Sequence, residues 1–286
     1  MAIRPYECAL VPAVRVGAQH AAPLLAVSLW LFGCGGGSPL LHPAQTLPMG
    51  DVRAAGGMSA NIAAGGLASG LRGARNIAAS DASAPFGSNS GYAKGALVAA
   101  AIAPGLAPFV AARVGIGQAF EGGLAYTGRA VRVDMRRGFD FGPWALSIGV
   151  GGSATLYGSQ QGTDLPNVDL SAIHGYGADL PLLVGYKSDA GLYMVWFGAR
   201  GGYEHVAIGA LTSEPDSVPE STASTQLDAN RYWGGGVVGV ATGFSRVHVA
   251  LEFSAAYQAV HGTYNAASTT VQGLTLGPAA ALWWQF

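Results

Sequence analysis

Apolar residues recur at every second position in several stretches of the chain, and this is the period of a β-strand. From Val247 to Tyr257 the odd positions are apolar, whereas His248 and Glu252 stand at even positions. The segment 131–136 reads Val-Arg-Val-Asp-Met-Arg, with charges on its polar side. Each such strand therefore presents one apolar face and one polar face.

Turn signals between these stretches divide the chain into ten candidate strands. The predicted strands are residues 49–62, 108–117, 120–127, 130–137, 143–158, 172–187, 191–210, 231–243, 246–260 and 269–286. Their connections alternate between long and short, apart from a two-residue connection at 128–129. The predicted long connections are 63–107, 159–171, 211–230 and 261–268. Because ten is an even number, both ends of such a sheet lie on the same side.

Composition indicates a lipid environment. Half of the 286 residues are apolar and only 11% are charged, against about 25% charged in a typical soluble domain. The longest charge-free apolar stretch in the first half, 95–112, contains Pro104, Gly105 and Pro108, which are costly inside a helix. Without a spanning helix, a closed β-barrel is the other structure that satisfies its backbone in lipid. The net charge of −1 gives no basic surplus, so no nucleic-acid partner is expected.

The amino terminus has the features of an export signal. Arg4 and Arg15 precede an apolar run at 21–32, and the run leads into Gly33-Cys34. This arrangement resembles a bacterial lipoprotein signal peptide. The resemblance implies a signal at 1–33, an acylated Cys34, and a flexible tether over 34–48. The alternative is an ordinary signal peptide with an incidental cysteine.

The carboxyl terminus reads Leu-Trp-Trp-Gln-Phe, with Leu282, Trp284 and Phe286 on one face of a strand. A terminal aromatic in this pattern resembles the closing strand of bacterial outer-membrane β-barrels, which the barrel-assembly machinery reads. The resemblance implies an all-β, transmembrane, antiparallel up-and-down barrel of about ten strands over 49–286. It also implies a location in the outer membrane of a Gram-negative cell envelope. The implied partners are outer-membrane lipid and the barrel-assembly and lipoprotein-processing machineries, and the oligomeric state stays open.

The polar faces of the strands place charged side chains in the lumen of such a barrel. The predicted lumen charge network is Arg113, Glu121, Arg132, Asp134, Arg136, Asp179, Arg200, Glu204, His248 and Glu252. A barrel of ten strands is narrow, so these charges are expected to pair and fill it. The alternative is a polar, porin-like pathway for small solutes, in which the arginines favour anions.

The long first connection, 63–107, is the least regular stretch of the sequence. Residues 64–80 are rich in Ala and Gly and could form a short helix. Residues 94–103 could instead extend the second strand beyond the membrane.

The sequence contains no catalytic motif, and we expect no enzyme, no cofactor and no metal site. The omptin proteases also have ten strands and use carboxylates and a histidine at the outer rim. Here His174, His205 and His261 lie near that rim, but no Asp-x-His or Asp-x-Asp pair occurs where that family needs one. The acidic loop 210–230 is the best candidate for external binding. We therefore expect a structural or surface-interaction barrel, with a narrow pore and then an outer-membrane enzyme as alternatives.

Overall fold

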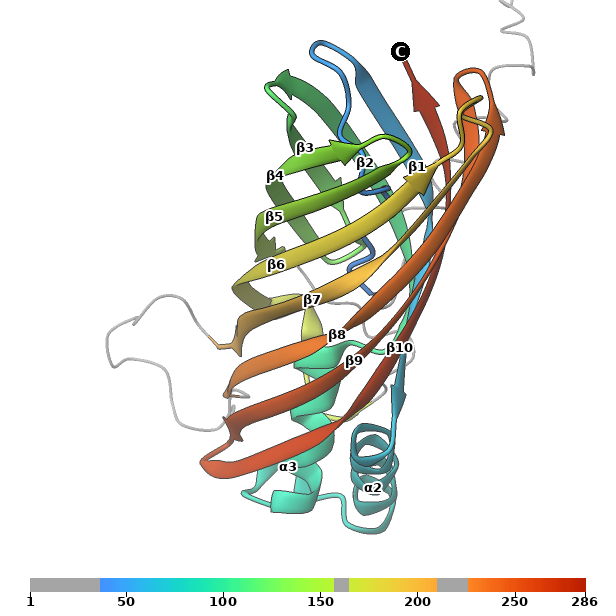
Figure 1. Ribbon diagram of the computed structural model, residues 1–286. Coiled ribbons are helices and arrows are strands. Elements are labelled where there is room, and N and C mark those ends of the chain that lie inside the picture. The colour runs from blue at the N-terminus through green and yellow to red at the C-terminus, as the bar shows by residue number, and fades with distance from the viewer. Residues whose placement is uncertain (1–36, 157–164, 210–225) are drawn as a thin grey trace, which may run out of the picture.

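The computed structural model describes residues 37–156, 165–209 and 226–286. Within these residues ten antiparallel strands close into a barrel, in which each strand pairs with its neighbours in sequence and β1 pairs with β10 (Figure 1). The strands are β1 (Val52–Ala64), β2 (Gly105–Gly117), β3 (Phe120–Tyr126), β4 (Ala130–Phe141), β5 (Trp144–Thr155), β6 (Ile173–Lys187), β7 (Tyr193–Ile208), β8 (Leu227–Phe244), β9 (Val247–Tyr264) and β10 (Ala267–Gln285). The predicted fold, an up-and-down barrel of ten strands, is confirmed.

The two ends of the barrel differ in their connections. At the turn end, where β1 begins and β10 ends, tight turns join β2 to β3, β4 to β5, β6 to β7 and β8 to β9. At the loop end, residues 65–104 join β1 to β2, and α2 and α3 lie there (Figure 1). Short turns on the periplasmic side and longer external loops are typical of outer-membrane barrels.

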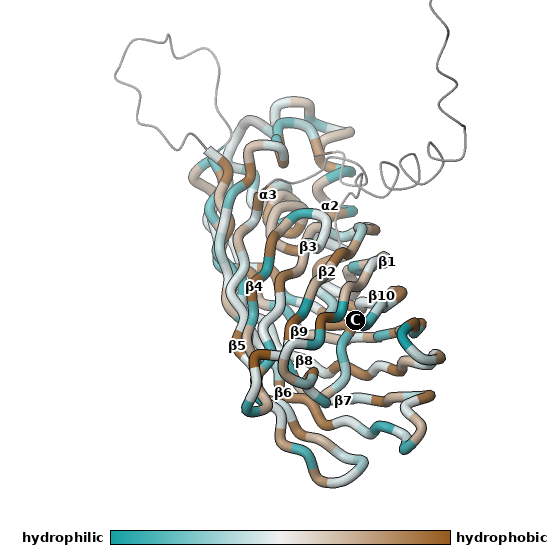
Figure 2. Tube along the Cα trace, turned by 90° about the horizontal axis from the view of Figure 1, so that it is seen from above, coloured by the Kyte–Doolittle hydropathy of each residue, from teal (hydrophilic) through white to brown (hydrophobic). Residues whose placement is uncertain are grey.

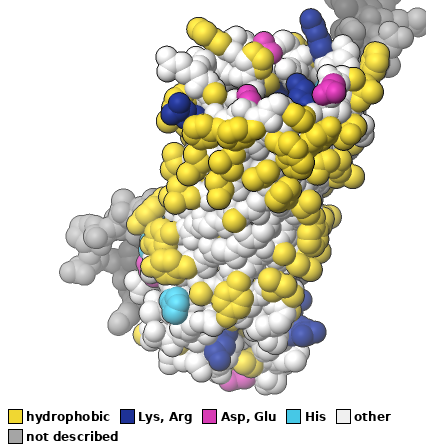
Figure 3. All heavy atoms as spheres, in the orientation of Figure 1, with side chains coloured by type: hydrophobic (Ala, Val, Ile, Leu, Met, Phe, Trp, Pro, Cys, Tyr) yellow, Lys and Arg dark blue, Asp and Glu magenta, His cyan; other side chains and the backbone are white. Residues whose placement is uncertain are grey.

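The outer face of the barrel is apolar and the inner face is polar. On β4, Val133 is 60% exposed, whereas its neighbours Arg132 and Asp134 are buried inside. Apolar and polar residues alternate along the strands (Figure 2). Apolar side chains form a broad band on the face in view, and charged side chains lie beyond it toward both ends (Figure 3). An apolar band around a barrel with internally paired strands is the arrangement that a bilayer requires, so the predicted transmembrane barrel is confirmed.

The first connection at the loop end is helical. It contains α2 (Gly66–Ser80), η1 (Ala84–Phe86), α3 (Ser90–Leu97) and the π-helix η2 (Val98–Ile102). The helix α2 matches the short helix predicted at 64–80. The prediction that 94–103 extends the second strand is wrong, because the alanine-rich run at 99–101 favours a helix and is buried inside the barrel. Within the described ranges, no helix is long and apolar enough to span a membrane.

Helix α3 and η2 fill the loop-end half of the lumen with apolar side chains. Leu97 and Ile102 belong to a buried cluster that includes Val206 on β7 and Val260 on β9. Tyr92 on α3 is wholly buried and its hydroxyl donates to a backbone carbonyl. Burial raises the pKa of the Tyr92 hydroxyl, so it is a neutral donor. The loop-end half of the barrel is therefore packed like the core of a soluble domain.

The predicted loop at 261–268 is wrong. Strands β9 and β10 continue beyond the predicted ends and meet at a two-residue turn, Asn265-Ala266. Both residues have positive φ, 43° and 68°, as tight hairpin turns between twisted strands require. Asparagine tolerates this conformation, but alanine gives no turn signal in the sequence.

Candidate functional site

A chain of ion pairs that alternates arginine and carboxylate crosses the turn-end half of the lumen. Glu121 on β3 is wholly buried. It contacts Arg113 on β2, and its Oε2 lies 2.9 Å from Nη2 of Arg136 on β4. Arg113 also reaches Asp134 on β4, with Nη2 2.6 Å from Oδ1. Glu121 thus accepts from two arginines, and this pairing compensates the burial of its charge.

The same chain continues around the barrel wall. Asp134 contacts Arg132 on its own strand. Arg132 Nε lies 3.0 Å from Oδ1 of Asp179 on β6, and Arg200 Nε on β7 lies 2.5 Å from Oδ2 of the same carboxylate. The whole network joins seven of the ten residues predicted to line the lumen. Its members are Arg113, Glu121, Arg132, Asp134, Arg136, Asp179 and Arg200.

Two inward-facing glycines allow these side chains to pass over an intervening strand. A Cβ on Gly123 of β3 would lie 2.6 Å from Nη1 of Arg113. A Cβ on Gly151 of β5 would lie 2.4 Å from both Arg132 Nη2 and Asp179 Oδ1. Alternation in the sequence predicts which charges face inward. The glycine positions determine which of them can meet across the strands.

Residues 37–48, which we call the plug segment, run through the lumen on the turn-end side of α3 and η2. Leu40 and Leu41 are buried there. Glu252 on β9 accepts hydrogen bonds from both backbone N–H groups, at 2.8 and 2.7 Å. It also accepts from Nε1 of Trp196 on β7, at 3.1 Å. Glu252 therefore binds the plug segment as a hydrogen-bond acceptor and has no arginine partner among the described residues.

The ion-pair network holds the other part of the plug segment. Glu121 accepts from the backbone N–H of Leu47, at 2.8 Å. Arg136 donates to the backbone carbonyl of Gln45, at 3.0 Å. Glu121 and Arg136 thus pair with each other and also bind main-chain atoms of the plug segment. A hydrogen bond to a charged group is stronger than one between neutral groups.

The described residues 37–48 differ from the flexible tether that was expected over 34–48. The glycine run ends at Gly37, and Pro39 and Pro43 then restrict the backbone. Apolar side chains of this segment enter the lumen while its peptide groups meet the wall charges. The predicted lipid-attachment residue, Cys34, lies outside the described residues.

A second ion-pair cluster lies next to η2, in the loop-end half of the lumen. Glu204 on β7 lies 2.9 Å from Arg129 and 2.9 Å from Arg231 on β8. These arginines also donate to the carbonyls of Ala100 and Ala101 in η2, at 2.8 and 2.6 Å. Cations are favourable at the carboxyl end of a helix, where carbonyl groups lack helical partners. The cluster therefore fixes η2 in the lumen.

Alternation in the sequence predicts Glu204 as a lumen residue but neither of its two arginine partners. Arg231 is an even number of positions from Trp233 and Val237 on β8, and those two residues face inward. The period of the strand therefore predicts that Arg231 also faces inward. Arg129 lies in the three-residue connection between β3 and β4, 127–129, where alternation gives no information.

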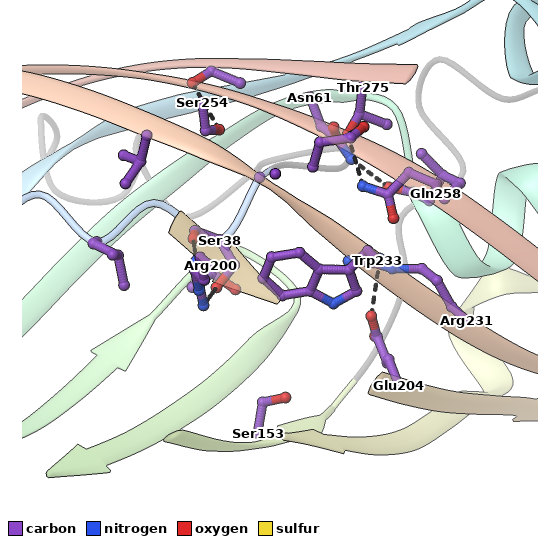
Figure 4. Close-up of a pocket in the computed structure, with 18 of the residues that line it drawn as sticks. Ser38, Asn61, Ser153, Arg200, Glu204, Arg231, Trp233, Ser254, Gln258 and Thr275 are labelled. Carbon is purple, nitrogen blue, oxygen red and sulfur yellow. Dashed lines mark hydrogen bonds and ion pairs between the residues drawn. The ribbon is translucent and has the colours of Figure 1, made fainter. Parts of the chain in front are cut away.

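A polar cavity of about 110 Å³ lies between the plug segment and η2 (Figure 4). Trp233 extends into it between Arg200 and Arg231, whose guanidinium carbons lie 5.0 and 5.8 Å from the indole ring centre. Gln258 Nε2 donates to Thr275 Oγ1 in the cavity wall, at 2.7 Å. At about 30 Å³ per water the cavity has room for roughly three or four water molecules. Drug-sized ligands usually occupy roughly 300 Å³ or more.

His248, the remaining predicted lumen residue, faces inward near the turn end. It is buried, with its ring centre 6.3 Å from that of Trp283. The described residues form no ion pair with it. Its Nε2 lies 3.4 Å from the carbonyl of Gly191, so His248 packs beside the network without joining it.

The residues of the predicted barrel-assembly signal are on the outer face. Leu282, Trp284 and Phe286 are each more than half exposed, and the rings of Trp284 and Phe286 stack with centres 6.1 Å apart. The backbone N–H of Phe286 donates to the carbonyl of Val52, at 2.9 Å, and so closes the seam between β10 and β1. The seam thus presents an apolar aromatic edge toward lipid.

Among the described residues, the histidines near the loop end do not assemble with a nucleophile. His205 Nε2 lies 3.6 Å from Asp228 Oδ2, beyond hydrogen-bonding distance, beside Tyr176 on the outer face. His174 is half-buried and His261 is exposed, elsewhere on that rim. The described part of the chain contains no group of three metal-ligating side chains. Most of the acidic loop at 210–230 lies outside the described residues.

No model of a protein family matches this sequence, and no curated protein matches it. Several solved structures are similar in shape. Neisserial surface protein A has 10% sequence identity and a TM-score of 0.33, and the match covers 82% of this chain and 96% of that one. The outer membrane protease OmpT from Escherichia coli has 9% identity and a TM-score of 0.36, covering 85% and 100%. A major outer membrane protein from Thermus thermophilus has 12% identity and a TM-score of 0.29, covering 82% and 99%. At these levels of identity and TM-score the comparisons assign no activity to this chain.

Proposed function

We propose that this protein is a closed outer-membrane barrel whose lumen is sealed by two parts of its own chain, and that its role is structural or at the cell surface. The observation behind this proposal is the plug segment, which is bound by Glu252, Glu121, Arg136 and Arg200 through its main-chain atoms. On the other side of the cavity, η2 is held by the Glu204 cluster. The charges of the turn-end network and of the Glu204 cluster thus pair with each other, and several of them also hold one of these two seals.

Single-channel current in a planar bilayer tests this proposal. The full barrel should be silent when its heat-dependent gel shift shows that it is folded. A variant that lacks both residues 37–48 and residues 90–102 should conduct, because both seals are removed. A variant that lacks residues 37–48 alone should stay silent, because α3 and η2 still fill the loop-end half of the lumen. Stable conductance by the full barrel would contradict the proposal.

A narrow pore for small solutes is the second candidate. The central cavity favours it, because Arg132, Arg200 and Arg231 already line a polar space at mid-lumen. This candidate requires both the plug segment and η2 to leave the lumen, and the hydrogen bonds that hold them are reversible. It predicts discrete current steps in the full barrel that change with Arg132→Ala or Arg136→Ala.

The proposal includes no enzymatic activity. A hydrolase at the rim needs a carboxylate and a histidine that orient a nucleophile within hydrogen-bonding distance. The pair His205 and Asp228 is separated by 3.6 Å and faces outward. Unchanged peptide after incubation with the folded barrel would support this part of the proposal, whereas cleavage lost in His205→Ala would refute it.

A further inference from the structure

A vestibule of about 420 Å³ opens at the turn end of the lumen, on the far side of the plug segment from the central cavity. Its wall contains three basic side chains, Arg53, Lys187 and Arg246, together with His248. The one acidic side chain in the wall is Asp51, whose Oδ2 accepts from Gln285 Nε2 at 3.2 Å. The vestibule therefore has more positive than negative side-chain charge and is large enough for a small ligand.

Arg53 is the feature that distinguishes this vestibule. It is 6% exposed, and it forms neither a hydrogen bond nor an ion pair with the described residues. Its buried Nη1 has no partner among the described residues. The other six inward-facing arginines discussed above each pair with a carboxylate. The carboxylate charge that acts on Arg53 is that of Glu121, which already pairs with Arg113 and Arg136. A buried guanidinium without a carboxylate partner of its own is costly.

The groups next to Arg53 compensate its positive charge only weakly. Its guanidinium carbon lies 4.9 Å from the ring centre of Trp283. This contact offers a cation–π attraction, which is weaker than a carboxylate pair. The indole Nε1 of Trp283 is itself buried without an acceptor among the described residues. Two neighbouring donors thus lack acceptors among the described residues, and the charged one, Arg53, lies in the vestibule wall with further cations.

We propose that the vestibule is a binding site for a phosphate group, with Arg53 as its principal ligand and Lys187 and Arg246 as supporting charges. A guanidinium matches the oxygens of a phosphate in two-point contact, and lysine adds a point charge. Free phosphate and a phospholipid headgroup share this chemistry, and both have access to the turn end. The site rests on the proposed seal, because Gln45, Thr46, Leu47 and Pro48 of the plug segment form part of its wall. Phosphate binding and bilayer current are separate readouts, so the two proposals can fail separately.

Calorimetric titration of the folded full chain with inorganic phosphate tests the site. The wild-type barrel in a phosphate-free glycoside detergent should bind phosphate, and Arg53→Gln should weaken binding at least tenfold. Lys187→Gln and Arg246→Gln should each weaken it several-fold. Arg137→Gln is the matched control, because Arg137 is an exposed arginine at the same end that packs on Phe120 and Phe139 outside the vestibule. Its affinity should equal that of the wild type.

Vesicles that contain phosphatidylglycerol distinguish the two sources of phosphate. Weaker binding of free phosphate there than in a phosphate-free glycoside detergent indicates that the headgroup competes for the site, whereas equal binding indicates the free ion. Arg53→Gln should fold, because it removes an uncompensated buried charge, and its gel shift verifies this. If it does not fold, Arg246→Gln replaces it, since Arg246 is exposed. The proposal is overturned if the wild type does not bind millimolar phosphate, or if the vestibule variants bind it as tightly as Arg137→Gln does.

Discussion

Neutralising Glu121 should destabilise the barrel more than any other change of one charge in the turn-end network. Glu121→Gln preserves shape but removes the negative charge shared by Arg113 and Arg136. Arg113 keeps Asp134 as a partner. Arg136 keeps only neutral backbone carbonyls among the described residues. Breaking a buried pair by removing one partner costs about 3–5 kcal/mol, and we expect the lower end because one arginine stays paired.

Urea unfolding of the barrel in lipid vesicles, followed by tryptophan fluorescence, measures this loss. With a slope of about 1–3 kcal/mol per molar urea, the midpoint should fall by roughly 1–3 M. Asp140→Asn is the control, because Asp140 is exposed near the end of β4. An exposed change of this kind should alter stability by less than about 0.5 kcal/mol. Adding Arg136→Gln to Glu121→Gln should recover part of the loss. A shift for Glu121→Gln no larger than that of the control would refute this account of the network.

Three further changes test other parts of the barrel. Gly151→Ala should lower unfolding free energy by roughly 1–3 kcal/mol, as overpacking typically does, because its Cβ would lie 2.4 Å from Arg132 and Asp179. The neighbouring Gly152→Ala has no atom closer than 4.0 Å and should change little in the same urea titration. Leu251→Arg, on the lipid-facing side of β9, should cost about 2–4 kcal/mol near the bilayer midplane and less toward either interface. Glu204→Gln should speed hydrogen exchange of the amides at 90–102, and unchanged protection would mean that the cluster does not hold η2.

The wall of the barrel follows from the sequence, whereas the contents of its lumen do not. Alternation identifies inward charges such as Arg132 and Asp134 because the period of a strand fixes which face each residue takes. Partner choice depends on register between strands and on glycines such as Gly151, which a one-dimensional pattern does not reveal. Arg53 also lies in a predicted strand, but a lone arginine in a run of alanine and glycine gives little alternation.

The sequence pattern does not predict the plug segment or η2, and the reason there is different. Residues 37–48 have no strand or helix period, so their proline and leucine content suggested only an irregular tether. Their conformation is set by wall groups far away in sequence, including Glu252. Residues 94–103 have an apolar sequence that suits either a strand or a buried helix. This segment is helical because its apolar side chains pack against the apolar strand residues that line the loop-end half of the lumen.

The plug segment has a direct consequence for the predicted lipid anchor. Gly37 lies beside Ala60, since a Cβ on it would be 3.3 Å from the Ala60 carbonyl. Ala60 is about 26 Å along β1 from its first residue, Val52, at roughly 3.3 Å per residue. With a tilt of about 40°, this places Gly37 roughly 20 Å from the turn end. The three residues from Cys34 to Gly37 span at most about 11 Å.

Cys34 itself therefore cannot reach the turn-end rim while the plug segment stays in place, and most of an acyl chain attached to it would lie in the lumen. We expect anchoring in lipid and sealing by the plug segment to exclude each other. Protein purified from membranes and shown by mass spectrometry to be acylated at Cys34 should exchange the backbone amides of Leu40, Leu41 and Leu47 quickly, because its plug segment has left the lumen. The Cys34→Ser variant, refolded without its signal, should protect these amides. A barrel that is both acylated and protected would show that the anchor leaves the lumen by another route, and the reach argument would fail.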